Sequence, residues 1–346
     1  MADDPFLRDL WYMAAHAASV KRGTMRRVML LGEPVNLGRM KSGEAFALRD
    51  ICPHRGVPLS AGKVMGDATV QCPYHGWQFR GDGQCTLIPS LVGGEAIRAE
   101  SIRVRSYPVR EQDGLIWVYM AAEGREDAPP RGDPPKVGIA DARPRWSESQ
   151  TFHCAIDHAV IGLMDPAHAP YVHGRWWWRV TPRVKEKHYA PLPAGFVMTR
   201  HAPTKQAYRL LGGDVSTEIT FELPGTRFEN IAGTLLGRRI GVVGLTTCTP
   251  IDERTTQVTQ TFYWPAWLGF IKPFFVALGP TFLGDDRRMV ELQREGLKFD
   301  PRLMLIQDAD MPAMWYHRLK KAWADSTATG APFVNPLKET TLRWRS

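Results

Sequence analysis

Two short segments, each holding one cysteine and one histidine together with a proline and a glycine, constrain this chain more than any other feature. Residues 52–56 read Cys-Pro-His-Arg-Gly, and residues 72–76 read Cys-Pro-Tyr-His-Gly. Proline and glycine favour tight turns, so both segments are expected to be loops. Two side chains with only one or two residues between them can converge on one point only from such turns. The chain must therefore contain a domain that holds two turns side by side.

The four side chains define the kind of site. Cys52, His54, Cys72 and His75 supply two thiolates and two imidazoles, the set needed by a two-iron, two-sulfur cluster with cysteines on one iron and histidines on the other. A structural zinc site of the Cys2His2 type is one alternative, but zinc motifs usually group the cysteines and group the histidines, whereas each segment here mixes them. Unrelated residues are the other alternative. The spacing favours the cluster.

The first 120 residues have the pattern of a small β-domain. Glycine and proline make up 31 + 27 = 58 of 346 residues, about 17% against an average near 12%, and this excess predicts many turns. The segment 121–145 is rich in proline and charge, which is typical of a linker. A chain of this length is expected to contain two domains. Short strands between turn residues are predicted at 28–31, 35–37, 45–49, 102–109 and 115–120.

The remainder of the chain has the pattern of a mixed α+β domain. Asp157 is the expected cap of its first helix. The sequence contains neither a dinucleotide-binding Gly-x-Gly-x-x-Gly nor a Walker loop, so electrons from a nicotinamide would have to arrive from another protein. Strands are predicted at 150–155, 196–200, 217–222, 240–249 and 257–263, and helices at 157–164, 286–298 and 311–325.

The charges and cysteines argue against several other classes. The positive excess, 44 − 36 = +8, is scattered, so no nucleic-acid partner is expected. Five cysteines without the spacing of a disulfide framework, and an N-terminus without a signal-like apolar core, favour a cytoplasmic location. The stretch Phe262–Leu283 has one charge, Lys272, and the length of a membrane span, but three prolines interrupt it. It is expected not to cross a membrane, and peripheral attachment is compatible with this pattern.

A second group of potential ligands follows the linker. Asp165, His168 and His173 lie close together in the sequence. Two histidines behind an aspartate could supply two ligands of a two-histidine, one-carboxylate site for non-haem ferrous iron, which leaves positions open for dioxygen. Two histidines in a loop are more often surface or core residues, so the pattern is weak by itself. Its position after the cysteine–histidine loops and the linker favours the iron interpretation.

Both groups resemble the motifs of Rieske non-haem iron oxygenases. Residues 8–120 are similar to the Rieske iron–sulfur domain, whose pattern is Cys-x-His followed by Cys-x-x-His. Residues 165–173 resemble the Asp-x-x-His-x4-His segment of the single-subunit O-demethylase and monooxygenase type. The resemblance implies a [2Fe-2S] cluster on the first set of residues below and a mononuclear Fe(II) on the second. These sets are Cys52, His54, Cys72 and His75, and His168, His173 and one later carboxylate.

The resemblance also implies the fold. An N-terminal all-β Rieske domain is expected over residues 1–120 and a linker over 121–145. A C-terminal helix-grip catalytic domain with an antiparallel sheet, of the kind shared with lipid-transfer proteins, is expected over 146–346. The fold class is thus α+β.

The family takes its carboxylate ligand from a later helix, in a stretch that resembles an acidic residue followed by Asp-x4-Glu. Residues 285–291 match, with Asp286 in the ligand position. Helical spacing places Asp286 on a face with Val290 and Asp285 on a face with Met289, so periodicity cannot choose between the two acids. Both could instead be acids at a helix N-terminus, where a negative charge interacts favourably with the helix macrodipole. Asp286 is taken as the ligand.

The implied function is that of the terminal oxygenase (alpha) component of a multicomponent system. A separate ferredoxin and/or flavin reductase would oxidise NADH or NADPH and pass electrons to the cluster, and O2 would react at the mononuclear iron. A head-to-tail homotrimer is also implied, with Asp165 linking His168 of its own chain to His75 of the partner subunit. The rival hypothesis is a non-catalytic Rieske electron carrier or ligand-binding protein without oxygenase function.

Large aromatic residues near the ligand segments favour a bulky, mostly apolar substrate, polycyclic or lipid-like. Alternatively, they pack in the core or in a subunit interface. Arg175 and Arg179 could pair with a substrate carboxylate, as an aromatic-acid O-demethylase or ring hydroxylase would require. Demethylase-type relatives carry Asn where Gly162 stands, so the substrate side of the pocket is expected to be roomier or differently hydrogen-bonded. The aromatic residues are Trp176–Trp178, Phe262, Tyr263, Trp264, Trp267, Phe270, Phe274 and Phe275.

Overall fold

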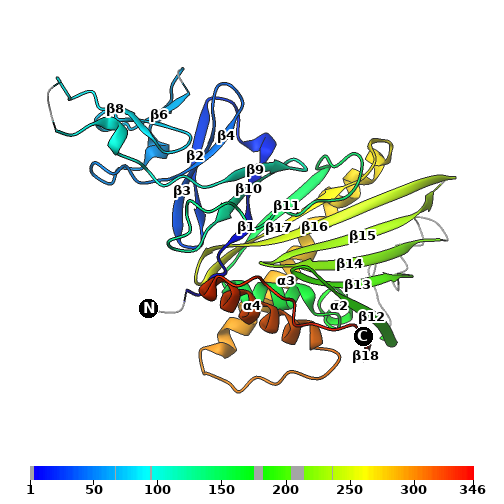
Figure 1. Ribbon diagram of the computed structural model, residues 1–346. Coiled ribbons are helices and arrows are strands. Elements are labelled where there is room, and N and C mark those ends of the chain that lie inside the picture. Colours follow the sequence, from blue (N-terminus) through cyan, green and yellow to red (C-terminus); the bar gives the residue numbers. More distant parts are fainter. Residues whose placement is uncertain (1–3, 67, 94–95, 175–181, 204–213, 236) are drawn as a thin grey trace. The chain divides into compact units, whose positions relative to one another are not determined.

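The computed structural model describes residues 4–66, 68–93, 96–174, 182–203, 214–235 and 237–346. The chain divides into two compact units (Figure 1). The N-terminal unit is Arg8–Lys136, and the C-terminal unit is Val137–Ser346 together with Met1–Leu7. The division falls inside the segment 121–145 that has the composition of a linker. The narrower domain limits expected from the sequence, 1–120 and 146–346, remain predictions.

The N-terminal unit is all-β among its described residues, with three small antiparallel sheets. Strand β10 is buried at every position because its six residues are all large and apolar. The first sheet contains β1 (Leu10–His16), β10 (Leu115–Met120) and β9 (Val109–Gln112), and the second contains β2 (Thr24–Leu30), β3 (Glu33–Arg39) and β4 (Ala45–Arg49). The third contains β5 (Lys63–Val64), β6 (Thr69–Gln71), β7 (Gln78–Arg80) and β8 (Cys85–Leu87), and short 3-10 turns lie at Ala17–Ser19, Leu59–Ala61 and Ala99–Ser101.

The prediction of a strand at 102–109 is wrong. The described chain there makes only isolated bridges at Arg103 and Ser106, and β9 begins at Val109. Pro108 has no N–H to offer a neighbouring strand. The amide of Tyr107 donates instead to the carbonyl of Ala47 at 2.9 Å.

The first part of the 121–145 segment packs on the N-terminal unit. The buried carboxylate of Asp9 forms ion pairs with Arg125 and Arg131, both at 3.2 Å. The indole N–H of Trp11 donates to the carbonyl of Gly132 at 2.7 Å. These contacts explain why residues up to Lys136 belong to this unit.

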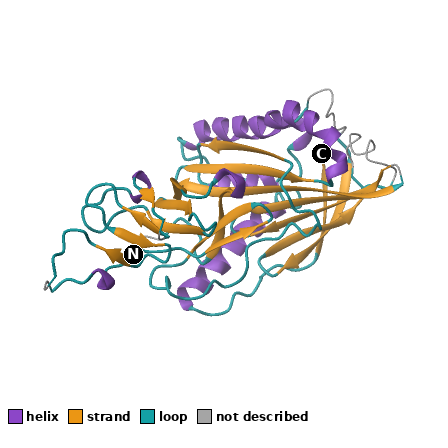
Figure 2. Cartoon of the chain, turned by 90° about the horizontal axis from the view of Figure 1, so that it is seen from above, coloured by secondary structure: helices purple, strands orange, loops and turns teal. Residues whose placement is uncertain are grey.

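The C-terminal unit contains, within its described residues, one antiparallel sheet in the order β11-β17-β16-β15-β14-β13-β12-β18. Helix α1 packs against β16 and β17, and α3 packs against β11; Figure 2 shows helices lying against the strands. The strands are β11 (Trp146–Phe152), β12 (Val184–Leu192), β13 (Gly195–His201), β14 (Ser216–Glu222), β15 (Thr226–Leu235), β16 (Arg238–Asp252), β17 (Thr255–Tyr263) and β18 (Thr340–Arg345). The helices are α1 (Ile156–Met164), α2 (Ala169–Val172), α3 (Lys272–Leu297) and α4 (Met311–Thr329), with a 3-10 helix η6 (Ala266–Ile271) before α3. The expected α+β class, with an all-β N-terminal part and a mixed C-terminal part on an antiparallel sheet, is confirmed.

Asp157 does not cap α1, contrary to the expectation. The N-cap position is Ala155, and Asp157 lies in the first turn. Its carboxylate accepts a hydrogen bond from the Tyr316 hydroxyl at 2.7 Å and pairs with the Lys320 ammonium at 2.8 Å. Asp157 therefore links α1 to α4. Local sequence spacing cannot reveal that its partners lie on α4.

Helix α3 begins at Lys272 rather than at Asp286, so it is much longer than expected. Pro280 lies inside it, where proline removes one backbone hydrogen bond. Packing of the apolar face offsets this loss, and the Gln150 side-chain amide donates to the Pro280 carbonyl at 3.2 Å. Because Asp286 lies far from the N-terminus of α3, the interpretation of it as a macrodipole partner is wrong.

Candidate metal centres

The two cysteine–histidine loops have the same backbone design. The Cys52 amide donates to the Val57 carbonyl at 2.9 Å, and the Cys72 amide donates to the Trp77 carbonyl at 2.8 Å. In each loop a glycine amide, at Gly56 or Gly76, donates back to the cysteine carbonyl. Both glycines have positive φ, 74° and 71°, a conformation that favours glycine. The turns predicted from the sequence are therefore present as a matched pair.

The loops bring the four side chains of the motif together. The rings of His54 and His75 have centroids 4.5 Å apart, and the ring of Trp77 stacks on His54 at 4.8 Å. Cys52 and Cys72 are 3% and 2% exposed. The thiols thus lie inside, and the imidazoles of His54 and His75 are partly exposed.

The chemistry of this donor set fits a cluster. Burial, together with the neighbouring Cys72 thiol, raises the pKa of Cys52 to about 11. The buried Cys52 thiol would therefore stay protonated unless a cation stabilised its thiolate. Two sulfur donors on the inner side and two imidazoles on the outer side match the ligands of a [2Fe-2S] centre of the Rieske kind.

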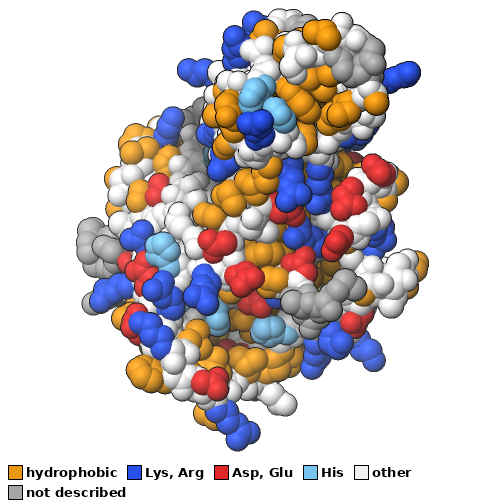
Figure 3. Space-filling view, turned by 90° about the vertical axis from the view of Figure 1, so that its left-hand side faces the viewer, with side chains coloured by type: hydrophobic (Ala, Val, Ile, Leu, Met, Phe, Trp, Pro, Cys, Tyr) orange, Lys and Arg blue, Asp and Glu red, His pale blue; other side chains and the backbone are white. Residues whose placement is uncertain are grey.

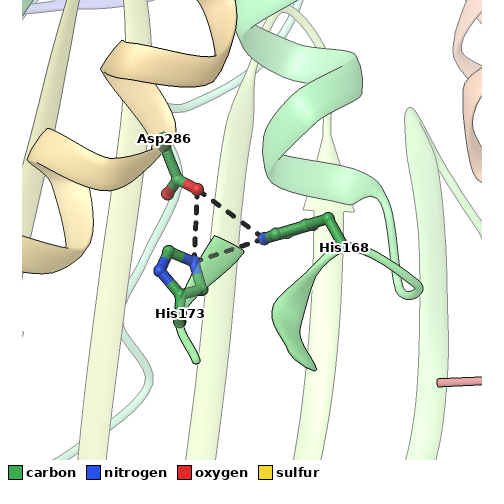
Figure 4. A group of neighbouring side chains, drawn as sticks. All are labelled: His168, His173 and Asp286. Atoms are coloured by element: carbon green, nitrogen blue, oxygen red, sulfur yellow. Dashed lines mark hydrogen bonds and ion pairs between the residues drawn. The ribbon is translucent and has the colours of Figure 1, made fainter. Parts of the chain in front are cut away.

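The second candidate centre joins the segment after α1 to the middle of α3. His168 is the residue before α2, His173 is the residue after it, and Asp286 comes from α3. The Nε2 atoms of the two histidines are 3.3 Å apart, and Asp286 Oδ1 lies 3.2 Å from His173 Nε2 and 3.6 Å from His168 Nε2. Figure 4 shows the three side chains pointing toward one another. Within the described part of the chain, these three residues are the group whose donor atoms lie close enough to share one metal ion.

The hydrogen bonds of His168 explain how this centre is prepared for a metal. Its Nδ1 lies 2.8 Å from the backbone carbonyl of Asp165, an acceptor, so Nδ1 carries the proton and Nε2 presents its lone pair. Burial lowers the pKa of His168, which favours the neutral imidazole that binds metals. A lone pair of His168, the facing nitrogen of His173 and the Asp286 carboxylate converge on one point, an arrangement that a bound cation stabilises. The residues therefore fit a two-histidine, one-carboxylate iron site.

Asp285 lies on the other side of His173. Its Oδ2 is 3.8 Å from His173 Nδ1, whereas Asp286 addresses Nε2 of the same ring. The His173 Nδ1 atom is buried and has no hydrogen-bond partner within 3.5 Å among the described residues. The geometry supports Asp286 as the ligand and gives Asp285 a position from which it can orient the ring. Spacing along the helix contained no signal for this difference.

Asp165 borders the second centre through both its backbone and its side chain. Its backbone carbonyl orients His168, and its Oδ1 accepts the amide of Ala167 at 2.6 Å. Its Oδ2 lies 3.8 Å from His168 Nδ1. Burial raises the pKa of Asp165. The structure therefore brings Asp165 next to His168, and its expected link to the partner subunit stays a prediction.

The expected aromatic lining is largely core. Tyr263 and Trp264 are 0% and 1% exposed, and Phe262, Trp267 and Phe275 pack on a buried cluster of the sheet. Burial of these rings stabilises the fold instead of leaving them for a substrate. Trp176–Trp178, Arg175 and Arg179 lie outside the described residues.

Phe282 is an aromatic residue that the sequence analysis missed. Its ring centroid is 5.1 Å from that of His173, because it lies one turn before Asp286 on α3. Its spacing of one helical turn from the proposed ligand Asp286 could have identified Phe282 from the sequence. A Cβ atom at Gly162 would meet no other heavy atom within 4 Å, which is compatible with the roomier site expected there.

A groove of about 620 Å³ lies elsewhere on the C-terminal unit, between the start of α1, the β16–β17 turn and the second half of α3. His153, His158 and Arg294 are among its lining residues. None of the proposed iron ligands lines it.

Comparison with known proteins supports both centres. Residues 10–108 match the family model of the Rieske [2Fe-2S] domain. The oxygenase component of dicamba O-demethylase from Stenotrophomonas maltophilia is 38% identical over 170 residues, which are 49% of this chain and 48% of that protein. The 4beta-methylsterol monooxygenase of Methylococcus capsulatus is 39% identical over 163 residues, 47% of this chain and 44% of that protein. The matched region spans less than half the length of these curated relatives.

A solved structure extends the similarity to nearly the whole chain. The crystal structure of dicamba monooxygenase bound to dicamba superposes with a TM-score of 0.72 at 25% identity, covering 94% of this chain and 99% of that one. The same enzyme has been solved with non-haem iron. The resemblance to Rieske non-haem iron oxygenases is thereby confirmed, and the family model supports a [2Fe-2S] cluster in the N-terminal unit. The individual ligand assignments remain predictions that the geometry supports.

Proposed function

We propose that this chain is the terminal oxygenase component of a Rieske-type system, which uses O2 and electrons from a separate reductase to hydroxylate or oxidatively dealkylate an organic substrate. One observation carries the proposal. The structure places His168, His173 and Asp286 around one point in a chain that also carries a Rieske domain. An electron carrier needs the cluster loops but has no use for a second set of converging ligands.

Two groups of residues in this chain would have separate roles. Cys52, Cys72, His54 and His75 would hold the cluster, which supplies one-electron transfer when bound, and the triad would hold an iron with positions open for O2 and substrate chemistry. His168 is held in one tautomer by the Asp165 carbonyl, so its donor atom is oriented before the metal binds. Trp77 covers one face of His54 and thereby fixes the ring at the surface end of the cluster site.

The substrate we propose is bulky and mostly apolar, polycyclic or lipid-like. The Phe282 ring beside His173 supports it. The similarity to a 4beta-methylsterol monooxygenase points the same way. The runner-up is an aromatic acid undergoing O-demethylation or ring hydroxylation, which the similarity to dicamba O-demethylase favours.

The partners follow from the same proposal. A ferredoxin and/or a flavin reductase would carry electrons from NADH or NADPH. A homotrimer would place Asp165 between His168 of its own chain and His75 of the partner subunit. A cytoplasmic location, with or without attachment to a membrane surface, is part of this proposal. Lys and Arg are interspersed with Asp and Glu on the face shown in Figure 3, so that face offers no continuous basic patch for nucleic acid.

Iron content tests the proposal against the carrier hypothesis. An oxygenase should bind about three iron atoms per chain, two in the cluster and one at the triad, whereas a carrier should bind about two. The purified protein should be brown, with a rhombic EPR signal after reduction. Substrate-dependent O2 uptake with a surrogate reductase, measured over a panel of sterol-sized, polycyclic and benzoate-sized compounds, then identifies the substrate class. A colourless protein loaded with zinc would contradict the assignment of the cluster.

A further inference from the structure

The 3-10 helix η6 and the first half of α3 expose an apolar surface that the oxygenase chemistry does not use. Phe270, Phe274 and Val276 are 66%, 50% and 55% exposed, and Pro273 and Ala277 beside them are also exposed. Positions 270, 273, 274 and 277 have the i, i+3, i+4, i+7 spacing of one helix face. These five residues form the apolar face. An exposed helix face in contact with water is normally polar.

The opposite side of the same segment packs on the protein's own sheet. Leu268 and Leu283 are fully buried, and the ring of Phe275 stacks on Trp264 with centroids 4.9 Å apart. The helical stretch Ala266–Leu297 is long and apolar enough to cross a membrane by length and composition, yet one side of it belongs to the core. A helix fixed on a sheet in this way offers one face, which suits the surface of a bilayer better than its interior.

Basic side chains border the apolar face. Lys272, the first residue of α3, is exposed, and the β15–β16 hairpin contributes the exposed Arg238 and Arg239. The Arg238 guanidinium carbon lies 5.8 Å from the ring centre of Trp267 in η6, so this hairpin lies beside the helix. Asp214 is an acidic group near Arg239, and its carboxylate is bonded to Thr234 at 2.8 Å. The sequence has no Asp or Glu between Glu253 and Asp285.

We propose that the apolar face binds the surface of a membrane that contains anionic lipid. The two phenylalanines would enter the boundary between headgroups and acyl chains, while Arg238, Arg239 and Lys272 would meet lipid phosphates. A two-fold symmetric dimer through this face fits less well, because it would bring the basic borders of both copies together. A head-to-tail contact of the proposed trimer pairs two different surfaces, and the oligomeric state measured below distinguishes it from membrane binding.

Membrane binding extends the proposed function, and its biological purpose rests on that function. Helix α3 carries Asp286 and all of the apolar face except Phe270, which lies in η6. A lipid-like substrate could therefore be collected from the membrane by the helix that helps to form the iron site. Binding to lipid needs neither substrate nor turnover, so vesicle binding and O2 uptake can fail independently of each other.

Vesicle sedimentation tests the proposal with the full-length, cluster-loaded protein. Vesicles of phosphatidylcholine alone are compared with vesicles that also contain phosphatidylglycerol. Binding is expected to the second kind and to weaken as salt is raised. The double variant Phe270→Ser/Phe274→Ser should bind at least about tenfold more weakly, and Arg238→Gln/Arg239→Gln should lose the preference for anionic lipid.

A matched control removes apolar surface elsewhere. Leu303 and Met304, 60% and 85% exposed, lie in the segment between α3 and α4. Leu303→Ser/Met304→Ser should bind vesicles like the wild type. Hydrogen exchange of the unaltered protein provides a measurement that needs no variant, and vesicles should slow exchange in residues 266–278.

Three results would overturn the proposal. They are a wild type that does not bind anionic vesicles, a control variant that loses as much binding as the Phe270/Phe274 variant, and hydrogen exchange at 266–278 that is unchanged on vesicles. A change in oligomeric state in the Phe270/Phe274 variant, without vesicle binding by the wild type, would assign the face to a second copy instead.

Discussion

Oδ1 of Asp286 lies 3.2 Å from Nε2 of His173, and Oδ2 of the neighbouring Asp285 lies 3.8 Å from Nδ1 of the same ring. The carboxylates of two adjacent acids on one helix therefore face the two different nitrogens of one imidazole. Nε2 also faces His168, whereas Nδ1 faces away from that partner. Asp286 is thus placed to share a metal with the two histidines, and Asp285 is placed to orient His173.

This difference predicts unequal effects of two matched substitutions. Asp286→Asn should lose the mononuclear iron, so that iron content falls from about three to about two atoms per chain while the visible spectrum of the cluster stays the same. Asp285→Asn removes the same charge one position away and should keep the iron, with affinity weakened by about 10- to 100-fold at most. Equal iron loss in both variants, or loss only in Asp285→Asn, would contradict the assignment.

Asp165→Asn is expected to separate metal binding from turnover. The backbone carbonyl that orients His168 is unchanged, and the new amide oxygen can still accept the N–H of Ala167. Both metals should therefore remain. Turnover should fall by about 10- to 100-fold or more, because the proposed link to the partner subunit's cluster loses its carboxylate. Stopped-flow spectroscopy should show a cluster that is reduced normally and reoxidised slowly. Normal turnover, or an active protein that is strictly monomeric, would rule out the bridging role.

Two glycines of α3 should respond to alanine with opposite signs. A Cβ atom at Gly279 would come within 2.1 Å of the Trp146 ring, so Gly279→Ala should lower the free energy of unfolding by about 1–3 kcal/mol through overpacking. A Cβ atom at Gly284 would meet only Gln150 Nε2, at 3.9 Å, and Gly284→Ala should raise it by up to about 1 kcal/mol through helix propensity. Urea unfolding followed by tryptophan fluorescence measures both. A stable Gly279→Ala variant would show that α3 is not held this closely against β11.

Glu33 should make the stability of the N-terminal unit depend on acid pH. Although burial opposes it, hydrogen bonds from Tyr107 at 2.7 Å and Arg8 at 2.6 Å lower the pKa of Glu33 below its ordinary value of 4.5. A carboxyl group with a lowered folded-state pKa stabilises the fold above pH 4.5, and this stabilisation is lost as pH falls through the folded value.

The variant Glu33→Gln isolates this contribution. It should unfold more easily than the wild type at pH 7, by about 1–3 kcal/mol, because charge-assisted hydrogen bonds are lost. The gap between the two proteins should narrow as the pH is lowered below 4.5. Thermal unfolding at several pH values gives the gap directly. A gap that stays constant with pH would mean that Glu33 does not titrate in this way.

Local motifs determined the cluster loops and much of the strand pattern. The strands at 45–49 and 115–120 were predicted with their observed bounds, because turn residues flank short apolar runs. The cluster loops were predicted because all four side chains lie within two short segments, where proline and glycine dictate the turns. The class of the protein followed from these residues and from the histidine pair at 168 and 173.

Tertiary structure alone decided which groups meet across long stretches of chain. Asp157 could be recognised locally as a helix-start acid, but its partners on α4 lie more than 150 residues away. The beginning of α3 was missed because packing of its apolar face outweighs the loss at Pro280, an energy that sequence spacing does not contain. The choice between Asp285 and Asp286 depends on how α3 is rotated against β11 and α2. That rotation is set by close contacts such as Gly279 against Trp146, which exist only once the sheet has formed.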